Sequence, residues 1–301
     1  MNREKVLAAF DRIRIWRKGG RRAPHKPLLI LLELGRMVAG GDATVEFAAA
    51  DSRLKALLDE FGPGNSGASR HYPFWHLQSD GVWSLEAPFE LLNRPMGATP
   101  TIGELRSSKV RGGFPVWIRE AFQKDPALIS IVAQRVVAAH FPESIREDVL
   151  EAAGLGDIEI NGESSGADKP RRRDPAFREK VLLAYEYRCC VCGHDMRLGR
   201  QCIGLEAAHI KWVQANGPDI ESNGLALCSL HHKFFDLGVF TVLPDQHRIA
   251  FSRHAITHDR ALSLHGAHLS LPPERELYPD PEYLEWHRKE VFKDPPRSFH
   301  A

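Results

Sequence analysis

The chain has 301 residues, of which 43% are hydrophobic and 26% are charged, and its formal net charge is +1. A single hydrophobic core rarely extends beyond roughly 250 residues, so this length and composition predict a globular protein of about two domains. The longest apolar run, residues 28–32, falls far short of the ~20 residues that span a bilayer, and the polar, charged N-terminus does not resemble a signal peptide, so we expect a cytoplasmic protein without a membrane partner.

The first half of the chain is predicted to be mostly helical. Residues 2–16 carry apolar side chains at helical spacing, with Asn2 as the expected N-cap. Residues 25–38 have a proline in the first turn and are apolar on nearly every side, which predicts the central helix of the core. Residues 72–85 alternate around Asp80-Gly81, a dipeptide that favours a β-hairpin turn. Three further helices are expected, at residues 114–123, 126–140 and 142–152.

A segment in the middle of the chain is predicted to link two domains. Residues 153–175 lack periodicity and are rich in Gly, Ser, Asp and Arg, which is typical of a flexible linker. A second domain follows, with helices expected at residues 175–187 and 281–293. We therefore expect an α+β protein in which a mostly helical N-terminal domain with a β-hairpin is tethered to a C-terminal domain. The predicted boundaries are 1–153, 154–175 for the linker, and 176–301.

Five cysteines are present, and three of them crowd into residues 189–192, which is poor geometry for disulfides and good geometry for a metal. Cys189 and Cys192 form a C-x2-C pair, and Cys228 with His231 forms a C-x2-H pair further along the chain. Two such turns can close a tetrahedral Cys3His site, whose ligands suit a structural Zn2+. The alternative is a set of buried thiols beside a surface histidine. Two cysteines are left over and are expected to be small core residues: Cys190 and Cys202.

Three polar residues near these ligands fall on a predicted strand, a loop and a helix. His209 lies near the end of the strand-like segment GLEAAHI, whereas Asn223 and His232 lie in SNGLALCSLHHKFFD, which predicts a turn entering a helix. This pattern resembles the ββα-metal fold of the HNH endonucleases. The resemblance implies that His209 is the general base, that Asn223 orients it or touches a metal, and that His232 binds a catalytic divalent ion. The alternative is that all three are ordinary polar residues.

One position departs from the HNH pattern. Many HNH enzymes have an aspartate or histidine metal ligand just before the base, and here that residue is Ala208. Glu206, two residues earlier on the same strand face, could replace it as a ligand for Mg2+ or Mn2+, or it could simply be a surface charge.

A basic segment precedes the predicted core helix. His25 and Lys26 are the first residues of this helix. Four positively charged residues precede it: Arg17, Lys18, Arg21 and Arg22. Positive side chains and backbone amides at a helix N-terminus suit a phosphate group. A solvated run of charge is the alternative explanation of this cluster.

The segments APHKPLL, RHYPFWHLQSDGVW and SSKVRGGFP, ahead of an HNH domain, resemble the sulfur-binding domain of McrA-like type IV restriction endonucleases. The likeness covers roughly residues 5–145 and 178–295 of the two domains. It implies that double-stranded DNA with a phosphorothioate is the partner, and that a small apolar surface at Tyr72 and Pro73 contacts the sulfur. Phosphates or base edges would be held by His25 and Lys26, together with Arg106 or Arg111.

We therefore expect a modification-dependent DNA endonuclease, in which an N-terminal reader docks on phosphorothioate DNA and the tethered HNH domain cuts nearby. Because one HNH site cuts one strand, a double-strand break predicts a homodimer. Two alternatives remain. The reader could recognise another mark, such as a methylated base, or the protein could be a non-cleaving DNA-binding regulator with a structural zinc.

Overall fold

The structure is a computed structural model that describes residues 3–15, 21–63, 69–95, 97–156, 175–257 and 260–299. Contacts divide the chain into two units. The N-terminal unit consists of Met1–Arg17 with Ala23–Asp168, and the C-terminal unit consists of Lys18–Arg22 with Lys169–Ala301. Asn2, predicted as a helix cap, and most of the predicted linker lie outside the described residues. The exact boundaries of the linker therefore stay a prediction.

The N-terminal unit is mostly helical, and its short strands form one small sheet. Its described helices are α1 (Arg3–Asp11), α2 (His25–Val38), α3 (Phe47–Phe61), α4 (His71–His76), α5 (Phe89–Leu92), α6 (Ile102–Ser107), α7 (Val116–Lys124), α8 (Ala127–His140) and α9 (Arg146–Ala152). Its strands are β1 (Val45–Glu46), β2 (Ser84–Glu86) and β3 (Arg111–Gly113). They pair antiparallel in the order β1-β3-β2, with Gly112 opposite both Val45 and Leu85.

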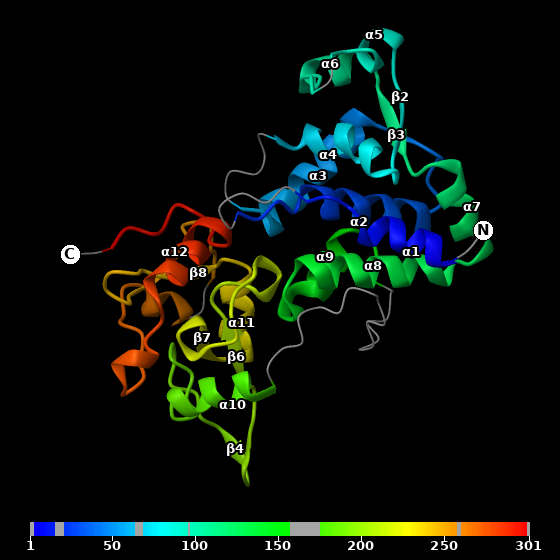
Figure 1. Ribbon diagram of the computed structural model, residues 1–301. Helices are drawn as coiled ribbons and strands as arrows, with labels where there is room; N and C mark the ends of the chain where they lie inside the picture. Colours follow the sequence, from blue (N-terminus) through cyan, green and yellow to red (C-terminus); the bar gives the residue numbers. More distant parts are fainter. Residues whose placement is uncertain are drawn as a thin grey trace. The chain divides into compact units, whose positions relative to one another are not determined.

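Helix α2 forms the centre of this unit. Every residue from Pro27 to Gly35 is buried, as the apolar segment predicted. Figure 1 shows α2 between α3 and α4 on one side and α8 on the other, and all three helices pack against it. The helices predicted at 114–123, 126–140 and 142–152 are confirmed by α7, by α8, and by a short 3-10 turn that leads into α9. Helix α1 is shorter than predicted and ends at Asp11.

The predicted β-hairpin at residues 72–85 is wrong. Residues His71–His76 form α4, and Leu77–Asp80 continue it as a 3-10 turn, so that only the last residues reach a strand, β2. Gly81 does adopt a positive φ of 77°. Here Gly81 ends a helix. The end of a helix and a hairpin turn both favour a glycine whose backbone lies in the left-handed region. Phe74 and Trp75 are adjacent and both buried, a pattern that fits a helix and breaks strand alternation.

The C-terminal unit is built around a strand-strand-helix motif. Its described elements are α10 (Pro175–Ala184), β4 (Arg197–Leu198), β5 (Gln201–Cys202), β6 (Leu205–His209), β7 (Gly224–Cys228), α11 (Ser229–Asp236), β8 (Phe240–Val242), β9 (Ile249–Phe251) and α12 (Pro281–Glu290). Strands β6 and β7 pair antiparallel, from Leu205 opposite Cys228 to His209 opposite Gly224. Helix α11 follows β7 directly (Figure 1). The segment predicted as a turn entering a helix therefore contains a strand as well.

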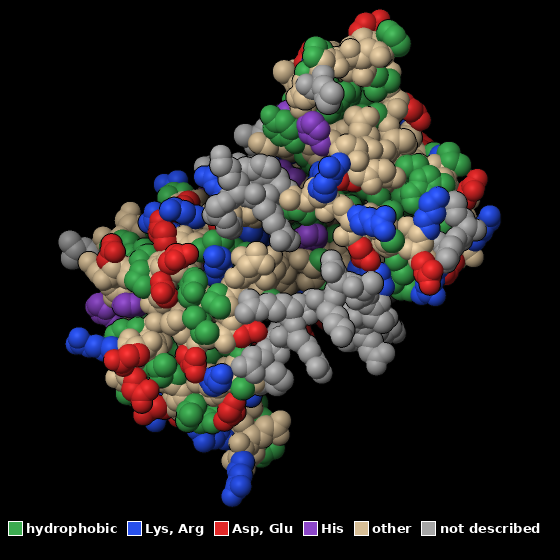
Figure 2. All heavy atoms as spheres, viewed as in Figure 1, with side chains coloured by type: hydrophobic (Ala, Val, Ile, Leu, Met, Phe, Trp, Pro, Cys, Tyr) green, Lys and Arg blue, Asp and Glu red, His purple; other side chains and the backbone are tan. Residues whose placement is uncertain are grey.

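Helix α10 packs closely against this motif. A Cβ added at Gly224 would lie 2.4 Å from a methyl group of Val181, so the glycine allows the helix to approach strand β7. Acidic and basic side chains are intermingled on the face of the C-terminal unit that Figure 2 shows, in keeping with the near-neutral net charge. Each helix that the structure describes is too short or too polar to cross a membrane.

Candidate functional site

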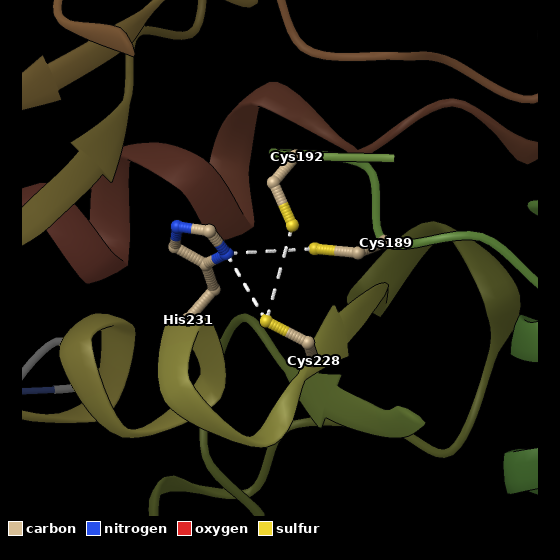
Figure 3. A group of neighbouring side chains, drawn as sticks. All are labelled: Cys189, Cys192, Cys228 and His231. Atoms are coloured by element: carbon tan, nitrogen blue, oxygen red, sulfur yellow. Dashed lines mark hydrogen bonds between the residues drawn. The ribbon is translucent and has the colours of Figure 1, made fainter. Parts of the chain in front are cut away.

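The four predicted metal ligands come together in the C-terminal unit (Figure 3). Cys189 and Cys192 lie on the loop after α10, Cys228 ends β7, and His231 lies in the first turn of α11. Nδ1 of His231 is 3.2 Å from Sγ of Cys228 and 3.7 Å from Sγ of Cys189, and the sulfur atoms of Cys192 and Cys228 are 4.0 Å apart. Ligands about 2.0–2.3 Å from a tetrahedral ion have separations of this size.

The backbone holds this cluster in place. The amide of Cys189 donates to the carbonyl of His194, and the amide of Gly193 donates back to Cys189, with Gly193 in the left-handed region at φ 74°. The amide of Cys190 donates to the carbonyl of Ala226 and so ties the loop to β7. Hydrogen bonds from Cys228 and His231 lower the pKa of Cys189, although its burial acts in the opposite direction. The metal-free cluster therefore favours one thiolate, at Cys189, whereas burial raises the pKa of Cys192 and the hydrogen bond to Cys189 raises the pKa of Cys228. The thiolate is the form that binds a metal.

Of the two cysteines predicted to be core residues, Cys190 is buried in the apolar cluster of the C-terminal unit, and burial raises the pKa of its thiol. Cys202 is half-buried on β5 and packs against the same cluster.

His209 is held between a ring and a carboxylate. Its imidazole stacks on Phe177 of α10, with ring centroids 4.0 Å apart and planes inclined by 14°. Its Nε2 atom is 2.8 Å from Oδ1 of Asp219. Both side chains are largely buried, with 11% of His209 and 8% of Asp219 exposed. The stack and the hydrogen bond fix the orientation of the imidazole.

Asn223 lies inside the framework of the site. Its side chain is completely buried, and its Nδ2 donates to the carbonyls of Lys211 and Pro218, while its Oδ1 accepts from the amide of Lys211. These three bonds close the loop between β6 and β7, which carries Asp219. The structure therefore places Asn223 where it can orient His209 through the loop, and both of its amide hydrogens are used for backbone contacts.

His232 lies between two carboxylates. Its Nδ1 is 2.6 Å from Oε2 of Glu206, and its Nε2 is 3.2 Å from Oδ2 of Asp236. Burial alone would lower the pKa of His232, but Asp236 and Glu206 together raise it to about 9. The other oxygen of Glu206 accepts a hydrogen bond from Ser229. The structure thus brings Glu206 and His232 together. This proximity is needed if Glu206 is to serve as the metal ligand that Ala208 cannot provide.

Two of the predicted DNA-binding residues pair with buried carboxylates of the N-terminal unit. Lys26 forms an ion pair with Asp80, and its side chain is 18% exposed. Arg106 donates to Asp51 at 2.6 Å beside Arg70, and 49% of its side chain is exposed. These pairs fix both cations on the unit, and the exposure leaves Arg106 better able than Lys26 to meet a phosphate.

Arg111 and His25 occupy different surroundings. Arg111 lies on β3 and donates from Nη2 to the carbonyl of Thr44 at 2.8 Å, with 39% of its side chain exposed. His25 is the first residue of α2 and is half-buried.

The two residues predicted to contact the sulfur, Tyr72 and Pro73, differ in their exposure to solvent. Tyr72 is 46% exposed, and its ring stacks on His71 at 4.4 Å and on His76 at 5.8 Å between centroids. Burial lowers the pKa of both histidines, which favours neutral rings beside the tyrosine. Pro73, in contrast, is buried in the first turn of α4. This burial counts against an open apolar surface at Pro73, and its contact with the sulfur stays a prediction.

The predicted basic cluster before α2 is only partly described, because Arg17 and Lys18 lie outside the described residues. Arg22 belongs to the C-terminal unit. Its guanidinium lies 3.8 Å from the ring centroid of Trp212 and donates to the carbonyl of Glu290 at 2.9 Å. Burial lowers the pKa of Arg22 to about 9 despite the nearby acids. It is engaged within the protein, so the interpretation of this cluster as a joint phosphate site is wrong for Arg22.

Sequence reasoning missed the two aspartates and the aromatic ring that hold the histidines. Asp236 is four residues after His232 on a predicted helix, and this spacing places two side chains on one face. Asp219 and Phe177 gave no comparable signal, because each meets His209 only through tertiary packing.

Comparisons with known proteins assign both units. The family described as ScoMcrA-like, DNA sulfur-binding domain, matches residues 3–158, and the HNH endonuclease family matches residues 189–243. Among curated proteins, none matches the chain.

Several solved structures align with about half of the chain at 22% sequence identity, including two sulfur-binding domains and one restriction endonuclease. The sulfur-binding domain of ScoMcrA, complexed with phosphorothioated DNA, is covered over 98% of its length by 52% of this chain, with a TM-score of 0.45. The sulfur-binding domain of SprMcrA, also complexed with phosphorothioated DNA, is covered over 98% of its length by 53% of this chain, with a TM-score of 0.41. The type IV phosphorothioation-dependent restriction endonuclease ScoMcrA is matched over 28% of its length by 51% of this chain, with a TM-score of 0.42.

The two family matches fall on different units. The sulfur-binding match covers more than half of the chain, and the HNH match covers the cysteine loop, both strands of the motif and helix α11. The chain belongs to the ScoMcrA-like DNA sulfur-binding domain family, and it joins that domain to a metal-dependent HNH DNA endonuclease domain.

Proposed function

We propose that this protein is a phosphorothioate-dependent DNA restriction endonuclease, whose N-terminal unit binds sulfur-bearing DNA and whose C-terminal unit cuts it. The observation that carries the proposal is the presence of both family matches in one chain. Sulfur in a DNA backbone takes the place of a non-bridging phosphate oxygen, and the solved sulfur-binding domains of ScoMcrA and SprMcrA are complexed with phosphorothioated DNA.

We assign a structural Zn2+ to Cys189, Cys192, Cys228 and His231. The donor set supports this choice, because three sulfur atoms and one imidazole nitrogen lie within 4.8 Å of one another. Such a set leaves no position for substrate and is typical of a structural zinc. The ion would join the loop after α10 to the β7–α11 corner, and thereby hold α11 in the orientation that presents His232.

In the proposed reaction a water molecule attacks the phosphorus atom, and a P–O bond of the phosphodiester breaks. His209 accepts the proton of that water at Nδ1, because the carboxylate of Asp219 keeps a proton on Nε2. Phe177 holds the plane of the imidazole by stacking on it. Asn223 contributes indirectly, since it closes the loop from which Asp219 reaches the base.

We assign the catalytic divalent ion, Mg2+ or Mn2+, to His232 and Glu206. A nitrogen and a carboxylate oxygen 2.6 Å apart fit a shared ion of this class, and Ser229 fixes the second oxygen of Glu206. When bound, the ion stabilises the charge that develops on the leaving oxygen. Ala208 is fully buried and offers no donor, which supports Glu206 as the ligand in its place.

For the reader, we propose that the exposed ring of Tyr72 contacts the sulfur. The neighbouring histidines, whose pKa values are lowered, present rings that favour the uncharged form. Such an apolar surface favours sulfur over an oxygen that would be stripped of its hydrogen-bonding water. The candidates for phosphate or base contacts are His25, Lys26, Arg106 and Arg111. The side chain of Arg106 is more exposed than those of Arg111 and Lys26.

One HNH site cuts one strand, so a double-strand break by this enzyme requires two copies, which we propose form a homodimer on DNA. Cellular DNA as the substrate accords with a cytoplasmic location.

Plasmid cleavage tests the proposed function. The full-length protein is incubated in Mn2+ with one plasmid prepared in three hosts, of which one adds phosphorothioates, one methylates bases and one does neither. We expect cutting of the phosphorothioate plasmid alone, and none by a His209→Ala variant. A preference for the methylated plasmid, or equal cutting of all three, would contradict the proposal.

A further inference from the structure

Asp236, the last residue of α11, is a buried carboxylate that contacts donors on His232 and Trp212 and lies near the charge of Arg22. Its Oδ2 lies 3.2 Å from Nε2 of His232, one helical turn earlier, and its Oδ1 accepts a hydrogen bond of 2.9 Å from Nε1 of Trp212. Only 1% of the side chain is exposed. Burying a carboxylate is costly unless polar partners hold it, so these contacts determine how Asp236 is placed.

Trp212 constrains which oxygen of Asp236 meets the imidazole. An indole nitrogen can only donate, so Oδ1 stays turned toward Trp212, and Oδ2 stays turned toward His232. Without metal, the two carboxylates favour a proton on each ring nitrogen of His232. The acceptor at Oδ2 keeps the proton on Nε2, so an ion shared with Glu206 would replace only the proton on Nδ1. The other ring nitrogen, Nδ1, is the one that faces Glu206 at 2.6 Å.

We propose that Asp236 is a positioning residue that fixes the ring orientation and tautomer of His232, so that Nδ1 is presented beside Glu206 as a metal donor. The inference rests on the proposed function, in which His232 and Glu206 hold the divalent ion. Metal-binding histidines commonly donate their second N–H to a carboxylate, and loss of that partner typically lowers metal affinity about 10–100-fold.

Asp236→Asn is the most discriminating change, because it keeps the shape of the side chain and removes one acceptor. The remaining oxygen stays with Trp212, which cannot accept a hydrogen bond, and the new NH2 group faces His232. Nε2 must then accept, and the ring proton moves to Nδ1, where it blocks the metal. We expect the affinity for Mn2+ to fall about 10–100-fold, with the zinc content and the circular dichroism unchanged.

Trp212→Phe is the matched control. It removes the other hydrogen bond of Asp236 and leaves both carboxylate oxygens able to accept from His232. If Asp236 merely anchors Trp212, the two variants should lose metal affinity equally. If it positions His232, the loss should occur in Asp236→Asn and not in Trp212→Phe.

The experiment combines two measurements on the zinc-loaded full-length protein. Mn2+ binding is followed by electron paramagnetic resonance, and the His232 tautomer is read from imidazole 15N–1H spectra in Mg2+, with the His232 signals identified by their loss in His232→Gln. We expect the wild type to carry its proton on Nε2, and Asp236→Asn to carry it on Nδ1 and to bind Mn2+ weakly.

Three outcomes would overturn the inference. They are a wild-type ring that keeps its proton on Nδ1 in saturating Mg2+, which is measurable even if the variant does not fold; an Asp236→Asn variant with wild-type Mn2+ affinity; and equal losses in the two variants. A wild-type protein that neither binds Mn2+ nor cuts DNA would overturn the proposed function together with this inference. If the wild type binds and cuts and the variant is unaffected, this inference fails alone.

Discussion

The imidazole of His209 and the carboxylate of Asp219 form a close pair, with Nε2 and Oδ1 2.8 Å apart, although one residue ends a strand and the other lies in the following loop. The pair depends on Asn223, whose amide closes that loop. In the proposed mechanism, the carboxylate of Asp219 therefore orients the base His209, and Asn223 acts through the loop that carries Asp219.

His209→Ala should abolish DNA cleavage while leaving zinc content, folding and DNA binding intact, because it removes the proposed base and leaves the zinc ligands and the N-terminal unit unchanged. General-base catalysis contributes about 10²–10⁴-fold to such rates. Asp219→Asn should reduce the rate by a smaller factor, since the imidazole remains and its orientation and tautomer are disturbed. Nicking rates on one DNA substrate provide the comparison, and a His209→Ala rate close to that of the wild type would remove this residue from the mechanism.

Cys228→Ala should behave differently, because Cys228 lies between the sulfur of Cys192 and the ring of His231 in the proposed zinc site. Structural zinc contributes about 10 kcal/mol or more to the folding of small metal-bound modules. We expect loss of zinc and unfolding of the C-terminal unit, measured by metal analysis and circular dichroism. Cys202→Ala is the control and should retain its zinc. A folded Cys228→Ala protein with one zinc per chain would show that the ligand set is wrong.

Mild chelation should stop cleavage before it unfolds the protein. The Cys3His cluster is closed and rich in sulfur, whereas His232 and Glu206 offer one nitrogen and one oxygen at a partly exposed position. We expect one zinc per chain to survive dialysis, and added Mn2+ to restore activity. Cleavage that persists after all divalent ions are removed would argue against an HNH mechanism.

Tyr72→Ala should narrow the preference for sulfur-bearing DNA over ordinary DNA. Burying roughly 30 Å² of apolar surface is worth about 1 kcal/mol, or about fivefold in affinity, so a larger preference must come from the penalty on a desolvated oxygen. Tyr72→Phe keeps the ring and should keep the preference. The measurement is the ratio of dissociation constants for matched duplexes at two salt concentrations. An unchanged ratio in Tyr72→Ala would exclude this ring from the sulfur site.

Sequence patterns predicted the features that depend on local spacing. The apolar segment of α2 is a buried helix, and the C-x2-C and C-x2-H turns converge on one cluster. The patterns failed where tertiary contacts decide. Gly81 has the positive φ that a hairpin turn needs, but it ends a helix, in which adjacent Phe74 and Trp75 are both buried.

The reader residues illustrate the same limit. Lys26 and Arg106 stand out in the sequence as available charges, yet Asp80 and Asp51, which come from distant segments, pair with them in the fold. Pro73 and Tyr72 are adjacent and both have apolar rings, but Pro73 is buried and Tyr72 is exposed. The sequence alone does not show which apolar residues are buried in the core.

Asp219 emerged only from the structure, because tertiary packing brings it to His209. The spacing of Asp236 from His232 could have indicated their contact, but the hydrogen bond to Trp212 could not be predicted from the sequence.

The most direct test of the central claim is the cleavage rate of the full-length protein on a duplex with one stereodefined phosphorothioate and on its unmodified twin, at one salt concentration and with Mn2+ present. We predict cutting near the sulfur in one duplex and little or no cutting of the other. Equal rates on the two duplexes would contradict the proposal that this protein reads sulfur before it cuts.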